Sequence, residues 1–198
     1  MLYQVVRAAV KTLYSLLFRY RISGEENIPN EGGIIFCPNH ISNHDAITVA
    51  ITQKRRLSFM GKDSLFTIPV LGWIFKKMGA FPVKRGTGDI GAVRKAIEIV
   101  NAGNALVMFP EGTRNKTGEL LLEFKTGAAL VAKKGNAVIV PMAIIGKYRL
   151  FSTITIQFGT PVTADDYGEK PDLHQMMADV REQVSQMITD GGSKTVSR

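Results

Sequence analysis

Gly33-Ile34-Ile35-Phe36-Cys37 is an unbroken apolar run that stops at Pro38. Two later runs have the same character, ALVMF at 105–109 and AVIVP at 137–141. A strand that is apolar at every position, rather than at alternate positions, is typical of a sheet covered by helices on both faces. These runs therefore predict an α/β fold with a mixed, largely parallel sheet flanked by helices.

Short apolar segments alternate with helix-like segments along the rest of the chain. Strands are predicted at 33–37, 57–60, 80–83, 105–109, 137–145 and 153–158. Helices are predicted at 45–52, 70–77, 90–101, 126–134 and 173–189. This alternation indicates one domain, which we expect to occupy residues 23–198 behind a separate N-terminal segment, residues 1–22.

The first 22 residues predict a basic amphipathic helix. Polar side chains recur at helical spacing among apolar ones, at Gln4, Arg7, Lys11, Ser15 and Arg19. Such a helix can lie on a bilayer surface with its apolar side buried, attracted by anionic lipid. Alternatively, it packs on the core and leaves its basic side chains in solvent. A signal peptide is not expected, because Arg7 and Lys11 interrupt any apolar core segment.

A second candidate for membrane contact is the stretch 66–85, FTIPVLGWIFKKMGAFPVKR. It combines the only Trp with several Phe and four basic residues, and aromatic side chains beside Lys and Arg are typical of interfacial surfaces. The periodicity by itself favours an ordinary helix and strand with a buried Trp.

Composition narrows the class of protein. The chain has 198 residues, 45% of them hydrophobic, and a formal net charge of +8, which excludes disordered and collagen-like chains. Its longest uncharged run has 15 residues (150–164), too short for a spanning helix of ~20 apolar residues. One cysteine allows no internal disulfide. The positive charge calls for an anionic partner: nucleic acid, a membrane surface, or an acidic substrate or carrier.

Two histidines lie together in Cys37-Pro38-Asn39-His40-Ile41-Ser42-Asn43-His44-Asp45, between a predicted buried strand and a predicted helix. A turn between His40 and Asp45 would bring the carboxylate to one imidazole nitrogen and leave the other facing a substrate. That pair suits a reaction in which a substrate hydroxyl, deprotonated by His40, attacks an activated acyl carbon. The competing interpretation is that Asp45 caps the following helix.

Other chemistry at this segment is less favoured. Cys37 ends a strand predicted to be buried, where cysteine usually packs as a small hydrophobe rather than acting as a nucleophile. His40 and His44 have metal-site spacing, but a third ligand is absent from the motif, so no metal is expected. His174 belongs to a polar helix and is predicted to be a solvated surface residue.

A second motif, Phe109-Pro110-Glu111-Gly112-Thr113-Arg114-Asn115, also follows an apolar strand. Gly112 and Thr113 supply an adaptable backbone and a hydroxyl, and Arg114 offers a planar fork for phosphate oxygens. Glu111 can hold that guanidinium or face an acceptor hydroxyl; alternatively, the motif is a surface turn with a local ion pair.

Cations stand at two further strand ends. Lys84 and Arg85 follow one predicted strand, and Lys62 follows another. Base, acid and cations at several strand ends indicate a single site around one anionic ligand.

Taken together, these blocks resemble the glycerolipid acyltransferase family, in particular short bacterial 1-acyl-sn-glycerol-3-phosphate acyltransferases. NHISNHD matches the N-H-x4-D motif, and the second block runs from Lys62 to Arg85. FPEGTR matches the third block and VIVPMAI the fourth, with FKTGAALVA between them. Lys84 and Asn115 depart from the family, whose members often carry an acidic or neutral residue and Ser at these places.

The resemblance implies transfer of a fatty acyl group from acyl-CoA or acyl carrier protein to the sn-2 hydroxyl of lysophosphatidate, without a cofactor. It implies that His40 is the general base and that Asp45 orients it. The positions implied for acceptor binding are Lys62, Arg85, Glu111, Gly112, Thr113 and Arg114. Pro141 is implied to shape the site near the acyl donor.

The resemblance also implies a peripheral, monotopic enzyme on the cytoplasmic side of the cell membrane. Two alternatives remain open at this point: an acyltransferase for another lysolipid or for glycerol 3-phosphate, and a non-catalytic binder of membrane or nucleic acid. No recognisable nucleic-acid module is present in the sequence, so nucleic acid is the least favoured partner.

Overall fold

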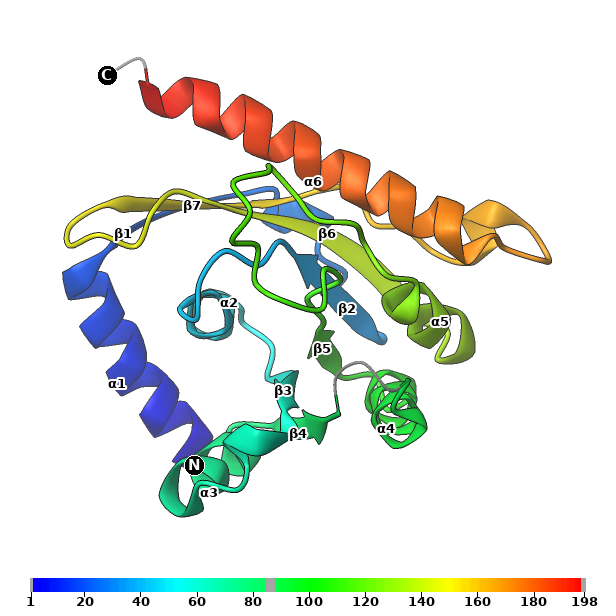
Figure 1. The fold of residues 1–198 in the computed structure, drawn as a ribbon, viewed down its shortest axis with the longest axis horizontal. Coiled ribbons are helices and arrows are strands. Elements are labelled where there is room, and N and C mark those ends of the chain that lie inside the picture. The colour runs from blue at the N-terminus through cyan, green and yellow to red at the C-terminus, as the bar shows by residue number, and fades with distance from the viewer. Residues whose placement is uncertain (1, 85–87, 197–198) are drawn as a thin grey trace.

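The computed structural model describes residues 2–84 and 88–196 of the chain (Figure 1). Within them lies a seven-stranded sheet with the order β1-β7-β6-β2-β5-β3-β4. Neighbouring strands are parallel, except β6 and β7, which are antiparallel. The α/β class and the mixed, largely parallel sheet are thus confirmed.

The strands are β1 (Arg19–Ser23), β2 (Ile34–Pro38), β3 (Leu57–Lys62), β4 (Ala80–Val83), β5 (Ala105–Val107), β6 (Val138–Ile145) and β7 (Thr153–Phe158). The helices are α1 (Leu2–Leu17), α2 (Asp45–Thr52), α3 (Pro69–Lys77), α4 (Ile90–Asn101), α5 (Gly127–Lys134) and α6 (Leu173–Val196). Three short 3-10 turns join them, η1 (Glu25–Asn27), η2 (Asp63–Leu65) and η3 (Asp165–Tyr167).

Helices cover both faces of the sheet, α1 and α2 on one and α4, α5 and α6 on the other (Figure 1). Successive residues of β2 divide between these faces. Ile34 and Phe36 belong to the core beneath α1 and α2, whereas Ile35 and Cys37 belong to the core beneath α4, α5 and α6. Each fully buried apolar side chain of this size stabilises the fold by about 1.5–3 kcal/mol, which is why the run carries no polar position.

The N-terminal helix is shorter than predicted. It ends at Leu17, and residues 19–23 form β1, which pairs with β7 in parallel register from Arg19 opposite Thr153. The predicted boundary at residue 23 therefore falls at the end of a strand of the sheet. Charged side chains on this edge strand conceal it from a hydrophobicity pattern, and edge strands carry such charges because they discourage pairing with other chains.

Other boundaries differ by smaller amounts. The strand predicted at 105–109 ends at Val107, although Met108 N–H still donates to Phe36 O at 3.0 Å. The last helix, predicted to end at residue 189, continues to Val196.

One face of helix α1 packs on α2. Tyr14 and Phe18 are buried in the core beneath it. Arg7, assigned by the pattern to a solvated polar stripe, turns inward and donates to the carbonyls of Ala50 and Gln53. The side chain thereby satisfies carbonyls at the C-terminal end of α2, where a cation is favoured.

The opposite side of α1 exposes apolar side chains to solvent. Val5, Leu13 and Leu16 are 63%, 53% and 68% exposed. At 100° per residue they fall on one face, opposite the docked face that contains Tyr14. The helix thus packs on the core and retains a free apolar face, and the membrane-surface position of this face stays a prediction.

The 66–85 stretch contains α3 and β4, but its tryptophan is not buried. Trp73 is 54% exposed, and Lys77 Nζ lies 5.9 Å from the centre of its ring. Ile68, just before α3, is also exposed. The prediction of a buried Trp is wrong, because α3 packs on β4 at the edge of the sheet and only part of the helix is covered.

No helix within residues 2–84 and 88–196 is long and apolar enough to cross a bilayer.

Candidate functional site

The carboxyl ends of β2, β5, β3 and β4 lie along one edge of the sheet, because these strands are parallel. Register places Phe36 of β2 opposite Val107 of β5, which in turn lies opposite Phe59 of β3. Loops that leave this edge therefore collect residues from distant parts of the sequence, as is usual for sites in α/β folds. Both catalytic-type motifs of the sequence emerge here.

His40 and Asp45 form the pair that their spacing predicted. His40 Nδ1 lies 2.9 Å from Asp45 Oδ2, and the Asp45 side chain is fully buried. A carboxylate only accepts hydrogen bonds, so Nδ1 carries the proton and Nε2 keeps its lone pair. Nε2 has no hydrogen-bond partner among the described residues, and the His40 side chain retains 11% exposure. The geometry is that of an oriented base.

The Asp45 carboxylate also organises the loop that contains its partner. Oδ2 accepts the backbone N–H groups of Ile41 and Ser42, both at 2.7 Å. These donors precede α2, and the side chain makes no capping bond at the start of that helix, where His44 is the cap residue. Asp45 therefore serves the His40 loop and does not cap α2.

Asn39 attaches the beginning of this loop to the sheet. The β2–β6 ladder ends with Pro38 opposite Met142. Beyond that point the buried Asn39 side chain receives Ile144 N–H at 2.7 Å and donates to Ile144 O at 3.0 Å. It thus replaces the strand that has turned away, because buried backbone groups need partners. Its role was not predicted, although it stands directly before His40.

Glu111 attaches the same loop from the other side. Its Oε1 accepts His40 N–H at 2.7 Å and its Oε2 accepts Leu122 N–H at 3.0 Å, and the residue is 3% exposed. A second bond joins the loops, from Asn115 N–H to His40 O at 2.7 Å. No ion pair with Arg114 is present in the part of the chain that the structure describes. The alternative interpretation, a surface turn with a local Glu111–Arg114 ion pair, is therefore contradicted among the described residues.

The His40 ring rests on an aromatic side chain. Its centre lies 4.0 Å from that of Phe109, with 26° between the planes. Phe109 is the first residue of the FPEGTR motif, so one short segment supplies both the surface beneath the imidazole and the Glu111 bridge. Stacking and backbone anchoring together limit rotation of the His40 side chain.

The structure describes some, but not all, of the cationic side chains predicted to bind the acceptor. Lys62 is exposed at the carboxyl end of β3, opposite Val83 of β4 and two strands from β2, about 10 Å across the sheet. Arg114 is half-buried and has no ion-pair partner among the described residues. Thr113 is exposed beside it. Arg85 lies outside the described residues, and Lys84 precedes that gap.

Pro141 lies inside the sheet. It is buried in β6, opposite Cys37 of β2, one residue before the β6–β7 ladder begins with Met142 opposite Phe158. The Pro141 carbonyl accepts Gly159 N–H at 2.9 Å. A residue without an N–H is tolerated in a central strand just outside a ladder, where no partner strand requires that N–H.

The competing chemistries of the motif gain no support. Cys37 is fully buried, and burial raises the pKa of its thiol, which disfavours the thiolate. His44 Nδ1 is 2.8 Å from Tyr14 Oη, so the two imidazoles have different partners. No group of three metal-ligating side chains occurs within the described ranges. His174 is exposed on α6, as predicted.

An aromatic cluster connects the site to α1. Around the His44 ring, Tyr14, Phe18 and Tyr148 lie with centres 5.8, 6.1 and 5.0 Å away. The Tyr148 hydroxyl donates to Thr48 Oγ1 at 3.1 Å, and burial, together with the Asp45 carboxylate, raises its pKa. Sequence reasoning missed this cluster, because its members come from three separate segments.

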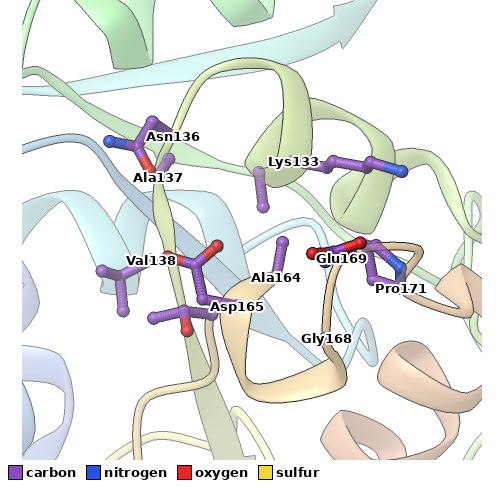
Figure 2. A pocket seen from close by; sticks show the side chains of 11 residues that line it. Lys133, Asn136, Ala137, Val138, Ala164, Asp165, Gly168, Glu169 and Pro171 are labelled. Atoms are coloured by element: carbon purple, nitrogen blue, oxygen red, sulfur yellow. The ribbon is translucent and has the colours of Figure 1, made fainter.

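A cavity lies elsewhere in the molecule. It has a volume of about 280 Å³ and is lined by residues from the end of α5, the start of β6 and the η3 region, including Lys133, Val138 and Asp165 (Figure 2). Val138 pairs with Ile34 at the amino end of β2, whereas His40 follows the carboxyl end. The cavity therefore lies at the opposite edge of the sheet and is not part of the site.

Comparisons with known proteins agree on one family. A family model described as Acyltransferase matches residues 19–145, well over half of the chain. The 1-acyl-sn-glycerol-3-phosphate acyltransferase of Bacillus subtilis is 27% identical over 195 residues, covering 96% of each chain. The chloroplastic 1-acyl-sn-glycerol-3-phosphate acyltransferase LPAT1 of Arabidopsis thaliana is 32% identical over 139 residues. That match covers 69% of this chain and 38% of the plant protein, so the chain spans well under half of its length.

The fold is shared with a solved structure. The crystal structure of the 1-acyl-sn-glycerophosphate (LPA) acyltransferase PlsC from Thermotoga maritima superposes with a TM-score of 0.77. The match covers 99% of this chain and 82% of that one at 22% sequence identity.

Proposed function

Because this chain belongs to the acyltransferase family, we propose that it moves a fatty acyl group from a thioester donor to the sn-2 hydroxyl of 1-acyl-sn-glycerol 3-phosphate, giving phosphatidate. The observation that carries the proposal is the His40–Asp45 pair, in which Nδ1 is held by a buried carboxylate and Nε2 is left as the basic nitrogen. The names of the Bacillus subtilis and Arabidopsis thaliana relatives support the acceptor.

The chemistry needs one base and an already activated carbonyl. His40 Nε2 accepts the proton of the acceptor hydroxyl as its oxygen attacks the thioester carbon. The tetrahedral intermediate then breaks its C–S bond, the ester forms, and the departing sulfur takes the proton from the imidazolium. Asp45 stabilises the imidazolium while it exists and keeps the ring in the productive tautomer.

The loops around His40 supply rigidity for this step. Three backbone N–H groups, those of His40, Ile41 and Ser42, are bound by the carboxylates of Glu111 and Asp45. A base that is fixed before the substrate arrives needs little reorganisation during the reaction. Arg114, half-buried beside this loop and without an acid partner in the described structure, suits the phosphate of the acceptor. Arg85 and Lys62 are further candidates.

The donor is proposed to be acyl-CoA or acyl carrier protein. Both present a thioester together with negative charge, which suits a chain of net charge +8. Pro141 is proposed, from the family resemblance alone, to shape the region near the acyl donor.

We also propose that the protein acts at the cytoplasmic face of the cell membrane. Exposed apolar side chains support an interfacial position: Val5, Leu13 and Leu16 on α1, Ile68 just before α3 and Trp73 on α3. An acceptor that resides in a bilayer is most easily reached by an enzyme that lies on that bilayer.

The test is an acyl-transfer assay with purified protein, lysophosphatidate, and acyl-CoA or acyl carrier protein. Phosphatidate is expected from the wild type and from His174→Ala, whose histidine is exposed and remote. His40→Ala is expected to fold normally and to lose turnover. Turnover retained by folded His40→Ala would refute the mechanism. Turnover only with a different lysolipid or glycerol 3-phosphate would refute the acceptor.

A further inference from the structure

The ammonium group of Lys125 lies against the loop backbone at Gly112, two residues before Arg114. Gly112 of that loop has φ +71°, and a Cβ built on it would stand 3.0 Å from Lys125 Nζ, 3.2 Å from Cε and 3.4 Å from Cδ. Three consecutive atoms of the lysine side chain thus run across the Gly112 backbone. The start of the side chain is fixed as well, because Lys125 N–H donates to Pro110 O at 3.0 Å.

This ammonium has no acid partner in the described part of the chain. The carboxylate within the same loop, Glu111, is committed to the N–H groups of His40 and Leu122. Two cationic side chains, Lys125 and Arg114, therefore accompany one loop, and neither forms an ion pair among the described residues. Such an arrangement suits an anion that arrives with the substrate, because charge-assisted bonds to phosphate are stronger than neutral ones.

The position relative to His40 favours the acceptor over the donor as the source of that anion. Lys125 contacts this loop at Gly112. The preceding residue, Glu111, accepts His40 N–H at 2.7 Å. In the acceptor, only two carbon atoms and an ester oxygen separate the reacting hydroxyl from phosphorus. In acyl-CoA, by contrast, the long pantetheine arm separates the thioester from every phosphate.

We propose that Lys125 Nζ binds the phosphomonoester of the acceptor together with Arg114, and that residue 112 is glycine partly because a side chain there would displace this lysine. The inference rests on the proposed function for its substrate. It adds a specificity-determining residue in the FKTGAALVA stretch, whose role the motifs alone left open.

The first test separates acceptor from donor. Lys125→Met is expected to raise the KM for lysophosphatidate about tenfold, as loss of one charged hydrogen bond predicts, with kcat within about twofold and the KM for acyl-CoA unchanged. Lys125→Arg is expected to recover most of the affinity. Lys133→Met, an exposed lysine on the remote side of α5, is the matched control and should behave as wild type. An unchanged KM for lysophosphatidate, or a rise confined to acyl-CoA, overturns the proposal.

A second measurement does not depend on turnover. Phosphorus NMR titration with glycerol 3-phosphate should show binding to wild type and Lys133→Met and weaker binding to Lys125→Met. If wild type binds this probe but makes no phosphatidate, the proposed function fails while the phosphate site stands. If Lys125→Met binds it as well as wild type does, the phosphate site fails.

Gly112→Ala supplies a double-mutant test. The new Cβ meets Lys125 Nζ, so this variant should also raise the KM for lysophosphatidate. In the Lys125→Met background the same change should add much less than it does alone. Full additivity of the two effects, in variants that melt at the same temperature, contradicts the inferred coupling.

Discussion

The buried carboxylate of Glu111 holds the backbone of His40, the proposed base: Oε1 accepts His40 N–H at 2.7 Å. Its other oxygen accepts Leu122 N–H at 3.0 Å. One side chain of the FPEGTR motif thus connects the His40 loop to the segment that leads to Lys125. The acid of this motif is a structural link between two halves of the site, which explains why it is 3% exposed.

Replacement of Glu111 is expected to loosen this link. In Glu111→Gln the amide nitrogen replaces one acceptor, so a buried backbone N–H loses its partner. We expect the free energy of unfolding to fall by about 1–3 kcal/mol and kcat to fall with it. Urea denaturation and acyl-transfer assays measure both. Glu119→Gln, an exposed glutamate in the same segment, should change neither. A stable but inactive Glu111→Gln would instead point to direct chemistry by the carboxylate.

Asp45→Asn tests the tautomer argument. All three donors bind Asp45 Oδ2, and a neutral amide oxygen in its place holds the Nδ1 proton of His40 less strongly and cannot stabilise an imidazolium as the carboxylate does. By analogy with other acid–histidine pairs, kcat should drop by about 10³–10⁴-fold. Steady-state kinetics of the folded variant decide this, with the exposed Asp190→Asn on α6 as control. A loss below tenfold would show that Asp45 is dispensable for orientation.

Asn39 is expected to matter for stability before activity. Asn39→Ala leaves both the N–H and the carbonyl of Ile144 without their buried partners. The expected loss is about 2–4 kcal/mol in the free energy of unfolding, measured by chemical denaturation. Asn43→Ala, an exposed position in the same motif, should fall within about 0.5 kcal/mol of wild type. Equal stability of the two variants would contradict the assigned role.

The free apolar face of α1 predicts where membrane binding can be abolished without unfolding. Leu13→Glu and Leu16→Glu place a charge on side chains that are 53% and 68% exposed, so the melting temperature should stay the same. Flotation with vesicles of phosphatidylglycerol and phosphatidylcholine should decrease strongly. Ser15→Glu adds the same charge on the polar flank and should float nearly as wild type does. Equal loss in all three variants would indicate general electrostatic repulsion.

Cys37 predicts both a labelling behaviour and a pH dependence. Burial raises the pKa of its thiol above the ordinary value of 9.0, so the folded thiol stays protonated where an unfolded one ionises. The unfolded state is therefore favoured as pH rises above about 9, and the free energy of unfolding should decline from there. Thiol reagents should label the protein only after unfolding, and Cys37→Ala should show a shallower decline. Rapid labelling of the native protein at neutral pH would refute the burial argument.

Some features of this protein depend only on spacing along the chain. His40 and Asp45 meet because four intervening residues form one turn, and a turn is a local structure. The both-sided burial of β2 follows likewise from an unbroken apolar run. Family membership, predicted from four ordered blocks, is confirmed by the family model that matches residues 19–145.

Other features arise only when distant segments come together. The Glu111–His40 bond joins residues separated by 71 positions and the Tyr148–Thr48 bond joins residues separated by 100, and no pattern in either segment indicates its partner. Arg7 has the same helical spacing as its solvated neighbours, yet it turns inward because α2 presents unpaired carbonyls beside it. Sequence alone thus predicted which residues carry the chemistry, whereas the packing of parallel strand ends decided which of them touch.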